Sequence, residues 1–488
     1  MRATGNASSR PPHVVVIGAG VTGLATAYRL LQPHSEGRAI GVTLLEAGQR
    51  VGGKLHTIEV DGVPVEAGAD SFVVRKPWAV ELCRDLGLED DLVIPGTTGA
   101  FVWARGKLHP FIEPSAFGIP AAPGALLRWE GLSVAGRLRA LLDLYRGRRR
   151  AEDDEALGRL LRRRLGREAA ATLVEPLLAG LHAADPERLS TLATFPELAM
   201  WERRHGSFIR GARASVRASR GSPGAMFATV WGGLSRLTAA LVSSIGGDRI
   251  RTDTPVTAIE RSGRGFIIDA GADHVEADAV VLATPAFETA RLLRRPAPNV
   301  ADSLDRIRYA STAVVVLVYP PGTGAALPSG TGFVVPSGAR ANLTACTWLS
   351  RKWPTPAYGD RAAIRCFVGR DGRDAVLEME DDDLIGAVRH EIEAITPVSA
   401  EPSAARVVRW PRGMPQYEVG HLDRLDAIDR DLRSVPGVFL AGSAYRGVGI
   451  ADCIRQANDV AAEVRRYTEE LVSPDHDPER RTEQEVSR

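Results

Sequence analysis

The stretch His13-Val-Val-Val-Ile-Gly-Ala-Gly-Val-Thr-Gly23 decides the fold. Its first five residues form an apolar run that is too short for a helix and rich in β-branched side chains, which predicts a buried strand. Gly18 would make the tight turn after this strand, Gly20 would let the backbone approach a pyrophosphate, and Gly23 would let helix and strand pack closely. The apolar spacing of residues 24–31 predicts the helix whose N-terminus would hold the pyrophosphate.

A second buried strand is predicted at residues 41–45 and ends at Glu46, whose carboxylate we expect to accept hydrogen bonds from ribose hydroxyls. A glycine triplet alone is a weak signal. Here strand, glycine turn, helix and strand-terminal acid follow one another in the order of a βαβ unit. The alternative is a strand-terminal carboxylate without a ligand.

Four later blocks distinguish FAD from a nicotinamide cofactor, and together they resemble the signature of the amine-oxidase-like flavoproteins. In this resemblance the glycine turn at 50–55 reaches the phosphate side of FAD, and residues 65–71 run under the isoalloxazine ring. The strand edge at 254–256 meets the adenine, and residues 439–451 bring a helix N-terminus to the ring. The residues assigned to FAD by these motifs are Gly18, Ala19, Gly20, Val21, Thr22, Gly23, Glu46, Ala47, Gly53, Lys54, Gly68, Ala69, Asp70, Ser71, Val256, Gly442, Ser443, Gly449, Ile450 and Ala451. Outside these motifs, Trp410 would pack on the flavin, as the matching residue does in related flavoproteins, or it is a core tryptophan.

Four blocks on the substrate side resemble the protoporphyrinogen/coproporphyrinogen oxidases of haem synthesis. They are residues 175–190, 231–237, 410–421 (Trp-Pro-Arg-Gly-Met-Pro-Gln-Tyr-Glu-Val-Gly-His) and 444–453. In the last block Ala451 replaces the proline that is usual in the family, which puts local rigidity in doubt more than the chemistry. The resemblance covers nearly the whole chain between residues 13 and 468.

Two features favour the coproporphyrinogen branch, which is found mainly in Gram-positive bacteria. Residues 69–76 and 344–354 resemble that branch, and Ala100 stands where the protoporphyrinogen branch typically has an arginine that faces a propionate. The resemblance implies an FAD-dependent, six-electron oxidation of coproporphyrinogen III to coproporphyrin III, with O2 as acceptor and H2O2 released. Oxidation of protoporphyrinogen IX is the alternative within the family.

The implied chemistry needs positioning more than acid–base catalysis. A porphyrinogen methylene bridge lies between electron-rich pyrroles, so a hydride can leave it if the bridge is held over the flavin. An amine oxidase or carotenoid desaturase would be another class, but neither an aromatic cage nor a lysine near the flavin is identifiable. A non-catalytic flavin-binding scaffold is disfavoured because the substrate-side motifs are present.

Candidates for substrate contact come from the same blocks. Arg75 and Lys76 could meet substrate carboxylates, the first by a bidentate fork and the second as a point charge, or they could be solvated charges before a helix. His182 lies where the family has an aromatic residue near the cavity, although a satisfied helix-end histidine is the alternative. Met414 and Tyr417 belong to the 410–421 motif and could equally be structural.

The order of these segments predicts an α/β chain with a discontinuous Rossmann-like FAD-binding domain, a mixed-sheet substrate domain and a helical subdomain. We expect residues 13–75, 225–290 and 437–468 in the first, 76–113, 201–224 and 291–436 in the second, and 114–200 in the third. The polar ends, 1–12 and 473–488, are expected to be disordered.

The composition of the chain limits the classes of partner that it can bind. A net charge of +1 over 488 residues gives no global field toward nucleic acid. Four cysteines without metal-ligand spacing argue against zinc and, with no signal peptide or spanning segment, favour the cytoplasm. The arginine-rich helices, with Arg137, Arg139, Arg146, 148–150 and 162–164, have two interpretations. One is a solvated helix face. The other is a surface for a peripheral membrane contact or for a haem-pathway partner such as a ferrochelatase.

Overall fold

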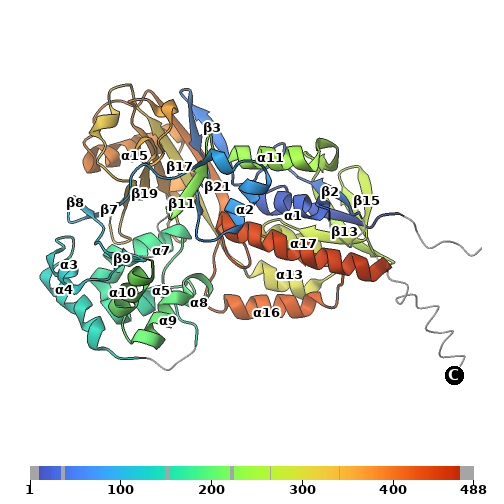
Figure 1. Ribbon diagram of the computed structural model, residues 1–488, viewed down its shortest axis with the longest axis horizontal. Coiled ribbons are helices and arrows are strands. Elements are labelled where there is room, and N and C mark those ends of the chain that lie inside the picture. Colours follow the sequence, from blue (N-terminus) through green and yellow to red (C-terminus); the bar gives the residue numbers. More distant parts are fainter. Residues whose placement is uncertain are drawn as a thin grey trace, which may run out of the picture.

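The computed structural model describes residues 10–33, 39–148, 153–219, 225–263, 265–339 and 341–472. These residues form three lobes (Figure 1). A Rossmann lobe lies to the right, a lobe built on a large sheet lies at the upper left, and a lobe of helices lies at the lower left. The predicted α/β class with its mixed sheet and helical part is confirmed. The predicted tails lie almost wholly outside the described residues.

The Rossmann lobe is built on a five-stranded parallel sheet. Its strands come from distant parts of the chain because β1 pairs with β2 on one side and with β16 on the other. The order across the sheet is β12 (Ile250–Arg251), β2 (Gly41–Leu45), β1 (His13–Ile17), β16 (Ala279–Leu282) and β22 (Val438–Leu440).

Both faces of this sheet are covered, because side chains alternate along each strand. Val14 and Val16 of β1 point to one face and share a core cluster with four helices. These are α1 (Val21–Leu31), α2 (Trp78–Asp85), α11 (Ser235–Ile245) and α17 (Ile450–Val472). Val15 and Ile17 point to the other face, toward a three-stranded meander and three more helices. These are β13 (Val256–Ser262), β14 (Gly265–Ala270), β15 (Asp273–Ala277), α12 (Ala286–Leu293), α13 (Pro298–Asp305) and α16 (His421–Leu432).

The sheet lobe contains seven strands, antiparallel except where β18 pairs with β7. The order is β21 (Ala404–Pro415), β17 (Tyr309–Val318), β20 (Ala363–Val368), β19 (Leu343–Trp348), β18 (Gly332–Val334), β7 (Phe101–Ala104) and β8 (Lys107–Pro110). Helix α15 (Asp381–Ile395) covers one face. The hairpin of β3 (Thr57–Val60) and β4 (Val63–Glu66) packs on the other face and so joins this lobe to the Rossmann lobe.

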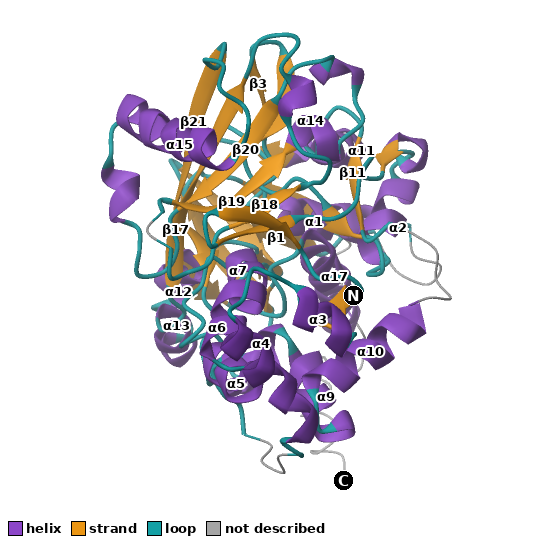
Figure 2. Cartoon of the chain, turned by 90° about the vertical axis from the view of Figure 1, so that its left-hand side faces the viewer, coloured by secondary structure: helices purple, strands orange, loops and turns teal. Residues whose placement is uncertain are grey.

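The helical lobe lies below the large sheet (Figure 2) and has its own apolar core. Its members are α3 (Pro123–Arg128), α4 (Val134–Leu141), η2 (Leu142–Tyr145), α5 (Leu157–Leu165), α6 (Arg167–Ala169), the π-helical η3 (Ala170–Val174), α7 (Glu175–Leu181), α8 (Thr191–Thr194), α9 (Pro196–His205) and α10 (Phe208–Ser219). Among the described residues, every helix is too short or too polar to span a lipid bilayer.

Short elements complete the three lobes. A small sheet, ordered β5 (Phe72–Val73), β11 (Phe227–Val230) and β6 (Leu92–Val93), borders α2. The remaining short elements are η1 (Glu89–Asp91), β9 (Ser115–Ala116), β10 (Ile119–Pro120), η4 (Gly247–Arg249), η5 (Gly324–Ala326), α14 (Leu349–Lys352), η6 (Pro356–Tyr358) and η7 (Ala375–Glu378).

The packing moves two of the domain boundaries expected from the sequence. The helical subdomain was expected to end at residue 200, but Trp201, Phe208 and Ile209 lie in the helical lobe's core and extend it through α10. Helices α12, α13 and α16 fall within the expected substrate domain, yet their apolar faces pack on the Rossmann sheet. Contacts between segments distant in sequence fix these boundaries, and local pattern does not reveal them.

Candidate functional site

The first glycine turn has two glycines that serve packing and one that faces open space. Gly18 has φ +100°, and a Cβ there would lie 2.9 Å from the carbonyl oxygen of Ala283. A Cβ on Gly23 would lie 1.9 Å from the carbonyl oxygen of Gly18. Nothing described lies within 4 Å of the corresponding point on Gly20, at the N-terminus of α1. The turn therefore offers backbone N–H groups and room for an anionic ligand.

Glu46 fastens this turn to the neighbouring strands. One carboxylate oxygen accepts a hydrogen bond from the Ala19 N–H at 2.8 Å, and the other accepts one from the Gly48 N–H at 2.9 Å. The Glu46 carbonyl accepts a hydrogen bond from the Thr254 N–H at 2.9 Å, which brings the start of β13 at Val256 to the same edge. The structure thus gathers the parts of the predicted adenosine site, and the ribose contact of Glu46 stays a prediction.

The second glycine turn docks onto the first. The Gly52 N–H donates to the Ala19 carbonyl at 2.7 Å, and a Cβ on Gly53 would lie 3.1 Å from the Gly20 Cα. Arg50, not singled out from the sequence, holds the turn from outside. Its guanidinium donates to the carbonyls of Val51, Gly53 and Leu55 at 2.8, 2.5 and 3.2 Å.

Lys54 and Trp410 meet at residues 67–69. A Cβ on Gly68 would lie 2.0 Å from the Lys54 carbonyl oxygen and 3.5 Å from the Trp410 ring, so only glycine fits. The Trp410 indole N–H donates to the Ala67 carbonyl at 2.8 Å. Burial lowers the pKa of the Lys54 ammonium. No hydrogen bond or ion pair engages that ammonium among the described residues, which suits it to an anionic ligand.

Asp70 and Ser71 complete this segment and bring in a lysine from far along the chain. The Ser71 hydroxyl donates to one Asp70 oxygen at 2.9 Å, and the Lys352 ammonium donates to the other at 2.8 Å. Lys352 lies in a block quoted from the sequence as a branch marker, but nothing there indicated that it reaches a residue 282 positions earlier.

The C-terminal glycine turn is held by Tyr417. The hydroxyl of this tyrosine donates to the Ser443 carbonyl at 2.7 Å and accepts from the Gly447 N–H at 2.9 Å. Its ring stacks on His421 with 4.0 Å between centroids, and the residue is 1% exposed. Tyr417 therefore supports the loop before α17 and has no free hydroxyl to offer a substrate. Nothing described lies within 4 Å of the Cβ position of Gly442, on the same loop.

Of the predicted substrate residues, His182 and Tyr417 lie together, with ring centroids 6.0 Å apart. Arg75 is exposed. The Lys76 ammonium is held by Asp452, in the first turn of α17, at 2.6 Å. Met414 is half-buried on β21 and pairs with Ala310 of β17.

His182 ends α7 at the contact between the helical lobe and the 416–417 segment. Its ring lies 6.0 Å from the Tyr417 ring, and its carbonyl accepts a hydrogen bond from the Gln416 amide at 3.0 Å. Burial lowers the pKa of His182 to about 4, so the ring is neutral near pH 7. Its Nδ1 has no hydrogen-bond partner in the described part of the chain, in contrast to a satisfied helix-end histidine.

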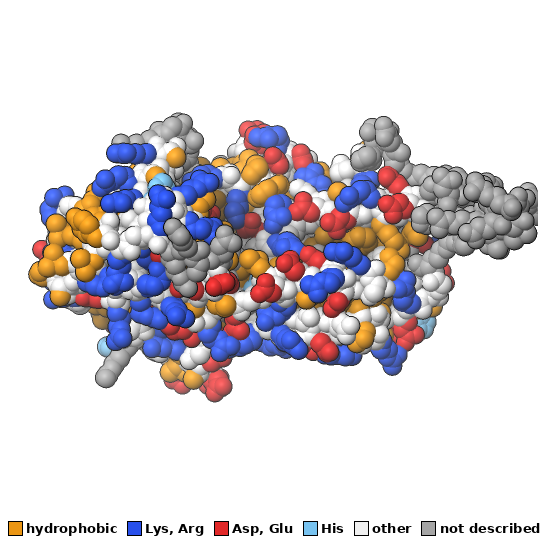
Figure 3. All heavy atoms as spheres, turned by 90° about the horizontal axis from the view of Figure 1, so that it is seen from below, with side chains coloured by type: hydrophobic (Ala, Val, Ile, Leu, Met, Phe, Trp, Pro, Cys, Tyr) orange, Lys and Arg blue, Asp and Glu red, His pale blue; other side chains and the backbone are white. Residues whose placement is uncertain are grey.

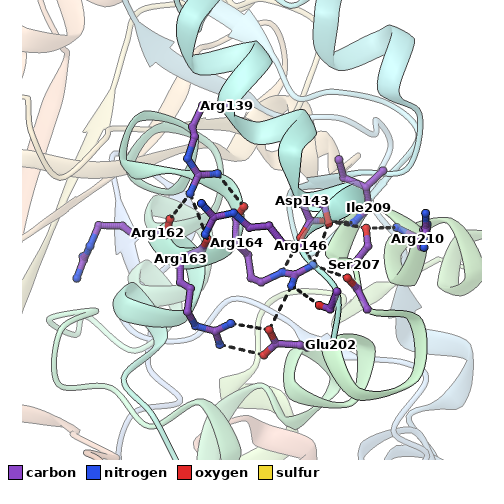
Figure 4. Close-up of polar contacts among 12 residues, drawn as sticks. Arg139, Asp143, Arg146, Arg162, Arg163, Arg164, Glu202, Ser207, Ile209 and Arg210 are labelled. Carbon is purple, nitrogen blue, oxygen red and sulfur yellow. Dashed lines mark hydrogen bonds and ion pairs between the residues drawn. The ribbon is translucent and has the colours of Figure 1, made fainter. Parts of the chain in front are cut away.

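The arginine-rich region is divided between a network inside the helical lobe (Figure 4) and exposed side chains such as Arg146. The interpretation as a solvated helix face is wrong for Arg164, and the surface contact stays a prediction. The Arg164 side chain is 1% exposed and paired with the buried Asp143, while Arg163 binds Glu202. Arg139 donates to carbonyls at the C-terminus of α5, at residues 162–164. These guanidinium groups cap a helix end and neutralise buried carboxylates, whereas Arg148 is exposed. Residues 149 and 150 lie outside the described residues.

The arrangement fits FAD. The turn at the start of α1, the strand-end acid Glu46 and the 50–55 turn are joined by hydrogen bonds, and α17 packs along α1. At Gly20 and Gly442 a ligand has room where any larger residue would intrude. A cofactor with a pyrophosphate, an adenosine ribose on one side and a ribityl chain with a planar ring on the other matches this set of donors.

Comparison with known proteins agrees with this geometry. The model of the flavin-containing amine oxidoreductase family matches residues 21–465. Coproporphyrinogen III oxidase of Bacillus subtilis is 34% identical over 463 residues, which cover 93% of this chain and 98% of that protein. The enzyme of the same name from Staphylococcus aureus is 33% identical over 465 residues, covering 92% and 98%.

A solved structure agrees as well. A protein of Exiguobacterium sp. 255-15, proposed to be a protoporphyrinogen oxidase, superimposes with a TM-score of 0.84 at 33% identity, covering 94% of this chain and 99% of that one. The chain therefore belongs to the flavin-containing amine oxidoreductase family, and it is an FAD-dependent oxidoreductase of the protoporphyrinogen/coproporphyrinogen oxidase group.

Proposed function

We propose that this protein oxidises coproporphyrinogen III to coproporphyrin III in haem synthesis. The observation that carries the proposal is the full-length match, without large gaps in coverage, to relatives that bear the name coproporphyrinogen III oxidase. Ala100, before β7, adds support because it removes the arginine expected for a protoporphyrinogen enzyme. Oxidation of protoporphyrinogen IX is the second candidate, favoured by the assignment proposed for the Exiguobacterium protein.

The chain's own contribution is to position the cofactor and substrate and to supply charge. When bound, FAD supplies a ring that accepts the hydride leaving a methylene bridge. Lys54 and the N–H groups of α1 would hold the phosphates, and Trp410 and Gly68 would set the height of the ring. Tyr417 fixes the loop that precedes α17, whose N-terminal dipole would face the ring. Arg75 is exposed and would meet substrate carboxylates.

No dedicated base is required in this scheme. Oxidation of a bridge acidifies the adjacent pyrrole N–H groups, so water can take their protons. Burial lowers the pKa values of His182 and His421 to about 4, so both imidazoles are neutral near pH 7 and are weak bases. O2 is the proposed acceptor that reoxidises the flavin, with H2O2 as product.

The experiment is anaerobic reduction of the bound flavin by coproporphyrinogen III and by protoporphyrinogen IX, followed by turnover in air with an oxygen electrode. Faster bleaching with the four-carboxylate substrate, with one H2O2 formed for each O2 consumed, supports the proposal. Preference for protoporphyrinogen would replace it by the second candidate. No bleaching with either compound would remove both.

A second proposal concerns where the enzyme works. An apolar stripe, formed by Leu127, Val134, Leu138, Leu142 and Tyr145, faces outward from α3, α4 and η2. Val134, Leu138 and Leu142 are 65%, 54% and 49% exposed and follow one another at helical spacing on one side. A patch of this kind usually has a partner.

The surroundings of the apolar stripe indicate the partner. Arg128, Arg146 and Arg148 are exposed beside it, and the helical end of the molecule gathers hydrophobic and basic side chains (Figure 3). An apolar strip flanked by arginines suits the interface of an anionic membrane. We therefore propose a cytoplasmic enzyme that rests on the membrane through this stripe.

Sedimentation with vesicles tests this contact. Wild-type protein should bind vesicles that contain phosphatidylglycerol more than pure phosphatidylcholine vesicles, and L138E/L142E should abolish the difference. Leu422→Glu, at a leucine 39% exposed on α16, is the matched control. Equal binding by L138E/L142E and wild type would reject the membrane contact. If the protein binds no vesicles at all, the membrane contact is rejected, and a protein such as a ferrochelatase is left as the partner that covers the apolar stripe.

A further inference from the structure

Four charged side chains form a buried cluster at the junction of the Rossmann and sheet lobes. The buried charge cluster consists of Glu66, Asp70, Lys352 and Arg365. Lys352 lies 2.8 Å from the Asp70 carboxylate, and the Arg365 guanidinium lies 3.8 Å from the same oxygen. The side chains of Asp70 and Lys352 are 13% exposed and that of Arg365 is 3% exposed. One carboxylate is therefore shared by two cations.

Arg365 lies in the middle of the large sheet and points away from α15. In β20 it alternates with Ile364 and Cys366, which belong to the core beneath α15. It shares its face with Ala363 and Phe367, and its Cζ lies 4.5 Å from the centroid of the Phe367 ring. This is the face on which the β3–β4 hairpin packs, so the guanidinium points toward the segment that carries residues 66–71.

Arg365 is incompletely satisfied. Its Nε and one terminal nitrogen are buried without a hydrogen-bond partner among the described residues. One Glu66 oxygen accepts from the Leu234 N–H at 2.6 Å and from the Thr57 hydroxyl at 3.0 Å, while the other has no partner in the described chain. A buried donor left unpaired is costly, so such groups usually face a ligand or an ordered water.

The cluster carries a surplus of positive charge. Burial alone would raise the pKa of Asp70, but the charges of Lys352 and Arg365 outweigh it and hold that pKa below its usual value. Burial raises the pKa of Glu66 to about 7, so this carboxyl is about half protonated at pH 7 and largely neutral below it. Below pH 7, two cations therefore face one anion.

We propose that Arg365, held by the Asp70 carboxylate that it shares with Lys352, is a cation for the isoalloxazine ring and stabilises the negative charge that the ring carries when reduced. The inference rests on the proposed placement of the flavin along residues 66–71. With the N-terminus of α17 at the loop of Gly442, the ring would be flanked by positive potential from two elements distant in sequence.

The midpoint potential of the bound flavin tests this, because it requires no porphyrinogen. Reductive titration of the holoenzyme against a reference dye should show that Arg365→Gln shifts the oxidised–reduced equilibrium toward the oxidised form by roughly tenfold, which is about 30 mV for a two-electron couple. Arg365→Lys should keep most of the wild-type potential because it retains the positive charge.

Two controls separate this role from structural support. Arg361→Gln, four residues earlier, removes a half-buried arginine that pairs with Asp61, and the potential should stay at the wild-type value. If Arg365→Gln fails to retain flavin, Lys352→Gln serves instead and should also lower the potential. An unchanged potential in Arg365→Gln or Lys352→Gln, or equal losses in Arg365→Lys and Arg365→Gln, would overturn the inference. Failure of the porphyrinogen assay alone would remove only the proposed substrate.

Discussion

Arg164 and Arg365 are both buried arginines beside an aspartate, and they differ in how completely they are paired. Arg164 donates to the Asp143 carboxylate at 2.6 Å and to the carbonyls of Asp143, Gly147 and Gly206 at 3.0, 2.9 and 2.6 Å. Arg365 has two nitrogens without a partner among the described residues. A buried arginine with all its donors paired stabilises the fold, whereas one with unpaired donors keeps them available to a ligand. Mutations can test this contrast.

The largest effect is expected at the fully paired arginine. Arg164→Met leaves Asp143 buried without its partner and should lower the free energy of unfolding by about 3–5 kcal/mol. Urea denaturation followed by circular dichroism measures this loss. Arg159→Met, at an exposed arginine of the same helix, should change stability by less than about 0.5 kcal/mol.

The folded fraction of Arg164→Met should keep the wild-type flavin potential, because the helical lobe's network does not face the ring. A shifted flavin potential in Arg164→Met, or equal stability of the Arg164→Met and Arg159→Met proteins, would contradict the contrast drawn between Arg164 and Arg365.

The second effect depends on pH. Burial raises the pKa of Glu66 to about 7 from an ordinary 4.5, although hydrogen bonds from Leu234 and Thr57 favour the ionised form. The folded state thus holds a proton that the unfolded state releases. The protonated Glu66 carboxyl therefore contributes its full stabilisation of the folded state below about pH 4.5, and this contribution is lost as pH rises through 7. Relative to Glu66→Gln, wild type should lose roughly 3 kcal/mol across this window.

Urea midpoints of wild type and Glu66→Gln between pH 5 and 8 measure this difference. Parallel curves for the two proteins would mean that Glu66 is ionised throughout, and the buried charge cluster would then be neutral.

A smaller effect is expected from Tyr417→Phe. Loss of the hydroxyl leaves the Ser443 carbonyl and the Gly447 N–H without their buried partner, which should cost about 1–3 kcal/mol and speed the release of FAD. Flavin fluorescence after dilution follows the release. Tyr145→Phe, at a tyrosine that is 83% exposed, should release FAD at the wild-type rate. Identical release by both variants would show that the loop before α17 is held by other contacts.

The smallest effect is expected at the rim of the helical network. Arg162 pairs with Glu187, and these side chains are 32% and 47% exposed. Solvent screens such a pair, so Glu187→Gln should cost less than about 1 kcal/mol in the same urea assay. A loss comparable to that of Arg164→Met would show that the network is one cooperative unit from core to rim.

Local patterns were enough to predict the cofactor half of the molecule. The strand at 13–17 and the strand at 41–45 have the bounds that their apolar runs indicated, because a buried parallel strand needs only a short β-branched run. The glycines at 18 and 23 are required by contacts with near neighbours in the fold. The helix expected at 449–467 begins one residue later and continues to Val472.

The rest depended on contacts that local patterns do not encode. Whether an arginine on a helix is solvated or buried is decided by distant carboxylates, as for Arg164 and Asp143. Lys352 and Arg365 reach Asp70 only because β20 and α14 pack beside the β3–β4 hairpin. The sequence motif did not indicate a role for Tyr417, whose hydroxyl accepts a hydrogen bond from the Gly447 N–H in the folded chain.

The interleaving of the Rossmann lobe has a consequence for how the protein is made. Helix α1 packs along α17, and Arg29 in α1 binds Asn458, which leaves the ribosome 429 residues later. Strand β1 likewise pairs with β16, whose residues are translated in the second half of the chain. The nascent polypeptide must therefore carry the apolar face of α1 uncovered through most of translation. We expect cofactor loading to follow chain release, with a chaperone shielding that helix until α17 arrives.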